Sequence, residues 1–114
     1  MVTFQVAETR FFLDSQRKQL WRGQPGSNEV DFTPIEWKVL NHLAGSNGAA
    51  VKKSELIATI WGNGGEDYYL AKTIGEVRRK IGDREPFQCI MTVRGRGYRL
   101  VTSAPSPDAL SVVS

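Results

Sequence analysis

Thr92-Val93-Arg94-Gly95-Arg96-Gly97-Tyr98-Arg99 places three arginines around two glycines near the end of this 114-residue chain. A glycine on either side of Arg96 permits the positive φ of a tight turn, so the stretch predicts a β-hairpin with a cationic tip. Three cations this close together repel one another unless an anion neutralises them. A second basic cluster, Arg78-Arg79-Lys80, lies shortly before the hairpin. Together the two clusters indicate a polyphosphate partner, and duplex DNA suits a basic helix beside an arginine-tipped hairpin.

Composition indicates one globular domain. With 40% hydrophobic residues, a chain of 114 residues can bury one modest core. No apolar run approaches the roughly 20 residues of a membrane span, and the first residues show no secretory signal pattern. The one cysteine, Cys89, allows no internal disulfide and no paired metal-ligand spacing, which favours a reducing, cytoplasmic setting.

Positive charge is concentrated in the C-terminal third. The net charge is only +3, but residues 68–99 hold eight Lys or Arg against three Asp or Glu, which makes +5 there and −2 elsewhere. An electrostatic footprint for a polyanion requires this kind of separation.

Apolar segments separated by turn-forming residues predict a small antiparallel sheet in the first part of the chain. Its expected strands are 3–6, 11–13, 19–21 and 30–32. Two more strands, 88–93 and 98–101, form the hairpin. Residues 102–114 show no core-forming pattern and are interpreted as a flexible linker, so the expected domain is 1–101.

Three helices are expected between the sheet and the hairpin. The first spans 34–45, because Thr33 can cap it, Pro34 suits its first position and Glu36 completes a capping box. The second spans 54–61 and the third 68–81. The expected buried side of the third helix, within about 60° on the helical wheel, consists of Leu70, Ile74, Val77 and Ile81. Its outward side consists of Tyr68, Lys72, Gly75, Glu76 and Arg79.

These elements predict an α+β fold, a winged helix-turn-helix with an N-terminal antiparallel β-sheet, three helices and a C-terminal β-hairpin wing. Four motifs in order resemble the OmpR/PhoB-type DNA-binding domain over nearly the whole chain except the tail. They are Phe32-Thr33-Pro34-x-Glu36, Leu56-Ile57-x-x-Ile60-Trp61-Gly62, Val77-Arg78-Arg79-Lys80-Ile81-Gly82-Asp83 and Thr92-Val93-Arg94-Gly95-x-Gly97-Tyr98-Arg99.

The resemblance implies sequence-specific binding of double-stranded promoter DNA by a bacterial transcription regulator. The helix 68–81 would enter the major groove and the wing 92–99 the minor groove. Family members commonly bind direct repeats head to tail, and their loop corresponding to 62–67, which here holds Glu66 and Asp67, can touch RNA polymerase. Residues 70–74 are more similar to the ToxR/CadC branch, in which a linker tethers the winged helix to a membrane span and a sensor domain. The domain would then be the cytoplasmic part of an inner-membrane protein.

Base reading is assigned by the resemblance to Lys72, which can donate to guanine, and Glu76, which can accept from a cytosine amino group. The alternative for Lys72 is a solvated lysine. Glu76 departs from the family, which often has arginine or another polar donor there, and it could instead pair with Lys72 or Lys80 four residues away. Gly75 costs about 1 kcal/mol in a helix interior, and its small size would let the helix sit deeper in the groove.

Phosphate is the expected partner of the remaining polar residues. Arg79 points outward to it, and Arg78 either does the same or pairs with Glu36. In the wing, the resemblance assigns the minor groove to Arg94, with Arg96 as a second candidate for a narrow A/T-rich groove. The resemblance also implies phosphate contacts for Thr92, Tyr98 and Trp61, and the hydroxyls of Tyr68 and Tyr69 could make further ones. Packing against the core is the alternative for Trp61, Tyr68 and Tyr69.

Two rival interpretations stay open. One is the effector domain of a phosphorylated two-component response regulator. The other is a winged helix used as a protein-interaction module, its base-reading face blunted by Gly75 and Glu76. An enzyme has no support, because His42 stands alone on its helix and no catalytic constellation is present; no cofactor or metal is expected.

Overall fold

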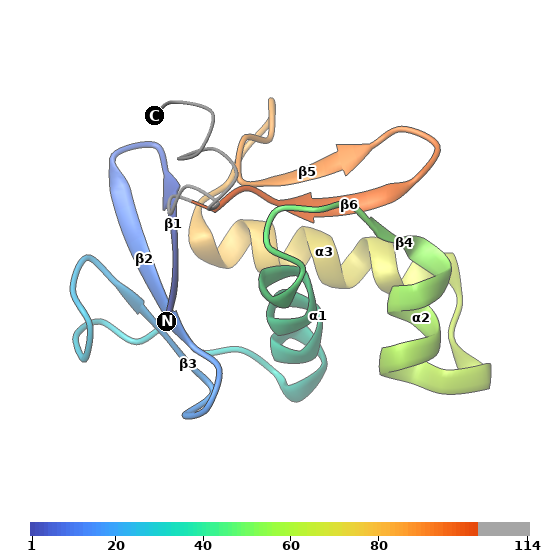
Figure 1. Cartoon of the computed structure of the whole chain (residues 1–114), viewed down its shortest axis with the longest axis horizontal. Coiled ribbons are helices and arrows are strands. Elements are labelled where there is room, and N and C mark those ends of the chain that lie inside the picture. The colour runs from blue at the N-terminus through green and yellow to red at the C-terminus, as the bar shows by residue number, and fades with distance from the viewer. Residues whose placement is uncertain (103–114) are drawn as a thin grey trace, which may run out of the picture.

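A three-stranded antiparallel sheet begins the chain, and three helices and a second three-stranded sheet follow it (Figure 1). The computed structural model describes residues 1–102. The predicted α+β winged-helix architecture is confirmed. The predicted linker lies, from 103 onward, outside the described residues.

The first sheet comprises β1 (Val2–Val6), β2 (Thr9–Asp14) and β3 (Gln19–Arg22), in that order. Alternate residues such as Phe4 and Phe11, whose rings stack at 5.2 Å, face the core. The predicted fourth strand at 30–32 is wrong, since only one isolated bridge, between Trp21 and Glu29, forms there. The chain leaves the sheet after this bridge because the cap of the first helix follows directly.

That helix, α1 (Pro34–Gly45), begins with the predicted capping box. Thr33 Oγ1 accepts from the Glu36 N–H at 3.2 Å, and Glu36 Oε1 accepts from the Thr33 N–H at 3.0 Å. Both hydrogen bonds satisfy backbone groups that a helix start leaves unpaired. The apolar side of α1, which includes Val39, Leu40 and Leu43, is fully buried.

Two more helices follow, α2 (Lys53–Trp61) and, after a short 3₁₀ turn at Gly62–Gly64, α3 (Asp67–Ile81). Both agree with the predicted spans to within one residue. The predicted buried side of α3 is confirmed, because Leu70, Ile74, Val77 and Ile81 are all inaccessible to solvent or nearly so. The helix ends at Gly82, whose φ of 81° is the left-handed conformation typical of a helix C-terminus.

The second sheet contains β4 (Val51–Lys52), β5 (Ile90–Val93) and β6 (Gly97–Leu100), in the order β4-β6-β5. The hairpin of β5 and β6 is the predicted wing. The sequence analysis missed β4, because two residues are too few to show alternation. This short strand attaches the wing to the start of α2, since Val51 pairs with Tyr98 and Lys52 with Gly97.

The two glycines of the wing have different tasks. Gly95 has a φ of 76°, the positive value that the turn requires. Gly97 does not have a positive φ, contrary to the prediction; a Cβ there would lie 1.9 Å from the Val51 carbonyl oxygen. Glycine at 97 is therefore needed for the close approach of β6 to β4.

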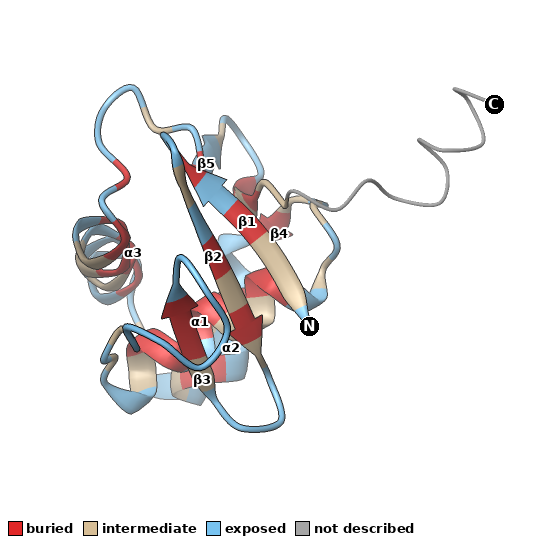
Figure 2. Ribbon diagram, turned by 90° about the vertical axis from the view of Figure 1, so that its left-hand side faces the viewer, coloured by how far each residue is buried: buried red, intermediate tan, exposed pale blue. Residues whose placement is uncertain are grey.

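One continuous core joins both sheets and all three helices, as the buried residues in Figure 2 show. Cys89 lies in this core just before β5, and burial raises the pKa of its thiol to about 12. The thiol stays protonated at neutral pH and packs as a small apolar group, as predicted. Within residues 1–102 no helix has the length and apolarity to cross a membrane.

The close contact of β4 and β6 predicts a cost for any side chain at 97. Gly97→Ala should lower the free energy of unfolding by about 1–3 kcal/mol, because its methyl group must push Val51 away. Urea denaturation followed by circular dichroism measures the change.

Gly75→Ala is the matched control, because a Cβ at 75 meets nothing within 4 Å. It should raise the free energy of unfolding by about 0.5–1 kcal/mol, as alanine replaces a helical glycine. If Gly97→Ala unfolded at the same urea concentration as the wild type, the close approach of β4 and β6 would be wrong.

Candidate nucleic-acid interface

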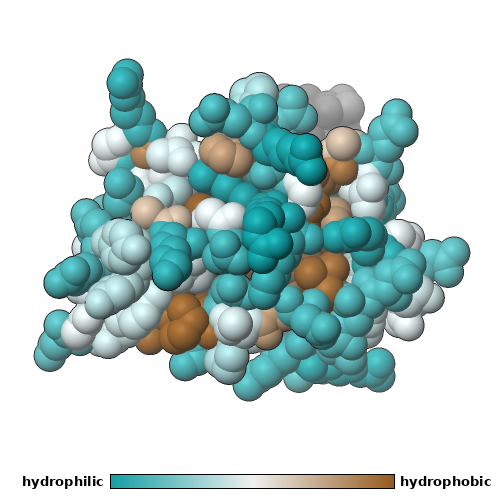
Figure 3. All heavy atoms as spheres, turned by 180° about the vertical axis from the view of Figure 1, so that it is seen from behind, coloured by the Kyte–Doolittle hydropathy of each residue, from teal (hydrophilic) through white to brown (hydrophobic). Residues whose placement is uncertain are grey.

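The outward side of α3 is free of the core along its whole length. The exposed residues, as predicted, are Tyr68, Lys72, Gly75 and Arg79. The buried residues between them, Leu70, Ile74 and Val77, pack against the core. Figure 2 shows α3 at one edge of the molecule with its buried residues turned inward. Figure 3 looks onto that edge from behind and shows a largely hydrophilic surface, with the hairpin tip projecting at the upper left.

Glu76 pairs with Arg79, one turn further along α3. Arg79 Nη2 donates to Glu76 Oε2 at 2.8 Å, and both side chains are partly exposed. This corrects the prediction of a pair with Lys72 or Lys80. Lys80 is unavailable because its ammonium group pairs with Glu36 of α1. The hydrogen bond and the charge of Arg79 lower the pKa of Glu76, so the carboxylate is ionised at neutral pH.

Arg78 is largely buried and does not pair with Glu36, whose carboxylate pairs with Lys80, so the predicted pair is wrong. Arg78 also lines a hollow of about 330 Å³ beside Gly75 and Arg79. Its Nε and Nη2 donate to the Ile90 carbonyl at 3.0 and 2.6 Å, and Nη2 also donates to Thr92 Oγ1 at 3.1 Å. The guanidinium lies 3.7 Å from the ring centre of Phe87. Burial lowers the pKa of Arg78. Arg78 thus fastens α3 to β5.

Asp83 fixes the segment between α3 and the wing from the other end. Its buried carboxylate accepts three backbone N–H groups, from Gln88, Cys89 and Ile90, at 3.1, 3.2 and 2.8 Å. Asp83 was named only as the last residue of a family motif, and this structural role was not predicted. The one available signal was its place directly after the glycine that ends α3, where the chain has to turn.

The wing presents cations at its tip and an aromatic ring at its base. Arg94 and Arg96 are exposed, and the Arg96 N–H closes the turn by donating to the Val93 carbonyl at 2.9 Å. Thr92 is exposed on the strand that leads to the tip. Tyr98 is buried, with Lys53 Nζ 6.0 Å from the centre of its ring.

Three aromatic side chains gather where α2 meets α3. The rings of Trp61 and Tyr69 are 6.5 Å apart, and those of Tyr69 and Tyr68 are 5.7 Å apart. Trp61 is half-buried against the core, in line with the packing alternative, whereas Tyr68 is 64% and Tyr69 45% exposed. The two tyrosine side chains therefore reach the solvent beside the outward side of α3.

Two basic residues at the start of α2 were missed by the sequence analysis. Lys53 lines a hollow of about 310 Å³ together with the wing residues 92–96. Lys52 and Lys53 line a second hollow, of about 720 Å³, beside Gly95 and Arg96. The dipeptide gives no signal by itself, because only the pairing of β4 with β6 brings it to the wing.

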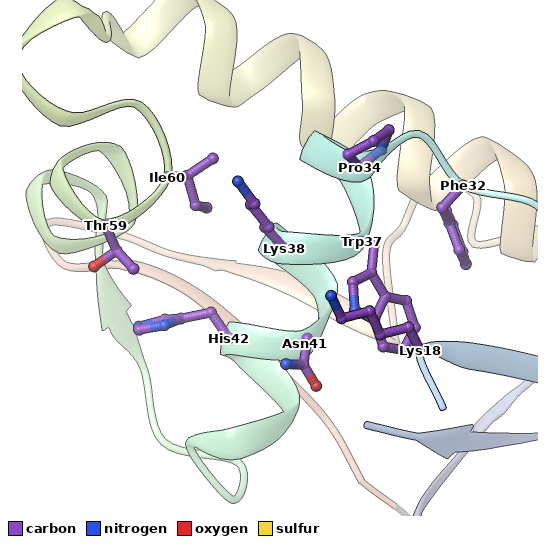
Figure 4. A pocket seen from close by; sticks show the side chains of 9 residues that line it. All are labelled: Lys18, Phe32, Pro34, Trp37, Lys38, Asn41, His42, Thr59 and Ile60. Atoms are coloured by element: carbon purple, nitrogen blue, oxygen red, sulfur yellow. The ribbon is translucent and has the colours of Figure 1, made fainter. Parts of the chain in front are cut away.

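Another hollow, of about 510 Å³, lies on the side of α1 that faces away from α3 (Figure 4). Trp37, Lys38 and His42 point into it from α1, and Ile60 borders it from α2. The sequence indicated no partner for His42, but in the structure its Nε2 lies 2.7 Å from Glu55 Oε2. Within residues 1–102, no group of three His, Cys, Asp or Glu side chains could hold a metal ion.

Residues 27–100 match the protein family described as "Transcriptional regulatory protein, C terminal". The chain is 36% identical over 74 residues to the transcriptional regulatory protein KdpE of Mycobacterium tuberculosis, a match that covers 62% of this chain and 33% of KdpE. It is 34% identical over 90 residues to CutR of Streptomyces coelicolor, covering 77% of this chain and 39% of CutR. The chain thus spans between a third and two fifths of the length of these relatives.

Solved structures share the fold. The DNA-binding domain of CpxR from E. coli superimposes with a TM-score of 0.66 at 26% identity, covering 91% of this chain and all of that one. The DNA-binding domain of Klebsiella pneumoniae RstA, solved with the RstA box, gives a TM-score of 0.67 at 22% identity over 87% of this chain and 96% of that one. With the greater part of its length matching the family, the chain belongs to the transcriptional regulatory protein C-terminal family as a winged-helix DNA-binding domain of the OmpR/PhoB type.

Proposed function

We propose that this domain of a bacterial transcription regulator reads promoter DNA with α3 in the major groove and the β5–β6 wing in the neighbouring minor groove. The observation that supports it most is the outward side of α3, which is exposed and polar along its length. It lies on the same face of the molecule as the hairpin tip (Figure 3). An α-helix fits the major groove of B-DNA, and side chains on its exposed side reach base edges there.

Unpaired cations support the electrostatic part of the proposal. In the part of the chain that the structure describes, no carboxylate lies within 4.0 Å of Lys72, Arg94 or Arg96. Each of these side chains can therefore neutralise a phosphate or enter a groove without first breaking an ion pair. Binding that displaces counterions from phosphates weakens steeply as salt rises.

Base reading is proposed for Lys72 and Glu76 on the centre of the outward side. Lys72 would donate to guanine, and Glu76 would accept from a cytosine amino group. The hydrogen bond from Arg79 holds the Glu76 carboxylate and offsets its repulsion from the DNA backbone. Gly75 leaves open space beside both residues, which lets the helix approach the base edges closely.

The wing and the aromatic corner are proposed to hold the backbone. Arg94, with Arg96 as a second candidate, would occupy the minor groove, whose negative potential is strongest where A/T-rich sequence narrows it. The proposed phosphate contacts are Thr92, Arg79, Tyr68 and Tyr69, and also Trp61 through its indole N–H and Tyr98 through its hydroxyl. Arg78 is a positioning residue, because its guanidinium is already engaged by β5.

The proposed partners beyond DNA are further copies of the chain, bound head to tail on direct repeats, and RNA polymerase, met by residues 62–67. The exposed Glu66 and Asp67 give that segment a negative charge distinct from the basic wing. Sedimentation of the domain with one or two selected sites would test the first partner. A charge-reversed Asp67→Lys variant in a transcription assay would test the second.

For the whole protein we propose the ToxR-like layout, a cytoplasmic winged helix tethered to an inner-membrane sensor, on the likeness of residues 70–74. The specific observation that favours a response regulator instead is the set of matched regulators, because this chain covers only 33% of KdpE and 39% of CutR. Fractionation of the native protein decides between them. Recovery from the membrane pellet supports the tether, whereas a soluble protein phosphorylated on aspartate supports the response regulator.

Sequencing of DNA fragments selected by the purified domain tests the proposed function. A single enriched motif, bound with an affinity that falls steeply with salt, is the expected result. A protein-interaction module would enrich no motif and would show no salt-dependent retention of DNA.

Arg94→Ala should weaken binding to the selected duplex by about 1–3 kcal/mol, roughly 5- to 150-fold in Kd, because a groove-inserted cation is lost. Fluorescence anisotropy across a salt series measures the Kd. Arg10→Ala, at an exposed position on β2, is the control and should bind like the wild type. If both variants lost the same affinity for the duplex, the proposed place of the wing in the interface would be wrong.

Glu76→Gln should strengthen binding to DNA of random sequence, because it removes a negative charge near the phosphates and releases Arg79 from its pair. If Glu76 reads cytosine, the same variant should lose preference at one base pair of the selected motif. Repeating the selection with the variant measures both effects. An unchanged motif would contradict the base-reading role, and an unchanged affinity for random DNA would contradict the repulsion.

A further inference from the structure

A hollow of about 310 Å³ lies under the wing, between the hairpin and the start of α2. Its lining consists of Lys53, Thr92, Val93, Arg94, Gly95 and Arg96. Three of these six residues are cationic and none is acidic. Within residues 1–102, no carboxylate lies within 4.0 Å of the Lys53 ammonium group. The hollow is thus a concentration of positive charge that the described part of the chain leaves without an anion.

Thr92 adds a hydroxyl group to the lining of the hollow. Its Oγ1 accepts a hydrogen bond from Arg78 Nη2 at 3.1 Å. A hydroxyl that accepts still has its own hydrogen to donate. Because Thr92 is exposed and lines the hollow, its hydroxyl can donate to an anion bound there.

Lys53 is restrained over the same hollow. Its Nζ lies 6.0 Å from the centre of the buried Tyr98 ring, within the range of a cation–π interaction. The pairing of Lys52 with Gly97 fixes the backbone next to Lys53 against the wing. A side chain held in place in this way loses less entropy when it binds than a free lysine does.

We infer that Lys53 and Thr92 form a phosphate-binding site under the wing, beside Arg94, and that this site takes one backbone phosphodiester of the duplex. The site rests on the proposed DNA binding and adds to it a residue of α2 that contacts the backbone beside the wing. The Lys53 ammonium group and the Thr92 hydroxyl can both donate hydrogen bonds, and the two non-bridging oxygens of a phosphodiester, which share one negative charge, accept them. One phosphate held here fixes how far the wing can enter the minor groove.

Lys53→Gln, which keeps a polar side chain and removes its charge, tests the site on the selected duplex. Its Kd should rise about five-fold, and the slope of log Kd against log salt should fall by about 0.9, the value for one phosphate contact. The control is Lys38→Gln, an exposed lysine on the side of α1 away from α3 (Figure 4). It should change neither quantity, and circular dichroism verifies that both variants fold.

Neutral phosphates identify the contact directly. Each phosphate of the duplex on the wing side is replaced in turn by an uncharged methylphosphonate, and the Kd is measured for the wild type, Lys53→Gln and Thr92→Val. At one position the wild type should lose about five-fold in affinity, while both variants lose nothing further. Lys38→Gln should lose as much as the wild type there.

The outcomes separate this site from the function on which it rests. If the wild type bound no duplex with steep salt dependence, the proposed DNA binding would fail. If the wild type bound as expected but Lys53→Gln matched Lys38→Gln at every salt concentration, or if every methylphosphonate weakened the variant as much as the wild type, the phosphate site would be overturned.

Discussion

The hydrogen bonds from Arg78 to the Ile90 carbonyl set the geometry on which the rest of the interface depends. They join the third helix to the first strand of the wing from inside the molecule, and Asp83 secures the intervening chain by accepting three backbone N–H groups. A winged helix can address two grooves at once only if the distance between helix and wing is constant. Arg78, whose guanidinium lies over the Phe87 ring, and Asp83 are two charged anchors hydrogen-bonded to the backbone, and together they supply that constancy.

Within one turn of α3, some basic side chains stabilise the fold and others face the solvent. Of the three consecutive basic residues at 78–80, the first holds β5, the second holds Glu76, and the third holds Glu36 at the start of α1. Of these three residues, Arg79 is the one whose side chain is mostly exposed, at 67%, and it can therefore reach a partner outside the domain. Counting cations therefore overstates the positive surface, and the side of the helix on which each residue falls decides its role.

Helical periodicity and capping residues predicted the elements well, because those signals are local. Thr33 and Glu36 specify a helix start within four residues, and the apolar spacing of Leu70, Ile74, Val77 and Ile81 specifies the buried side of α3. The errors arose where distant segments meet. The two-residue strand β4, the engagement of Lys80 by Glu36 and the burial of Arg78 all depend on tertiary packing that no local pattern records. Lys53 was missed for the same reason.

Because Gly97 contacts Val51, the base and the turn of the hairpin differ in how well they tolerate amino-acid substitutions. At the base, an atom added to position 97 collides with the neighbouring backbone, so that end is closed to variation. At the turn, Gly95 has open space around it and the arginines on either side project into solvent. As long as Gly95 keeps the positive φ of the turn, exchanges of the two arginines beside it can accumulate with little folding penalty, which lets one scaffold be retargeted to grooves of different width while its base stays fixed.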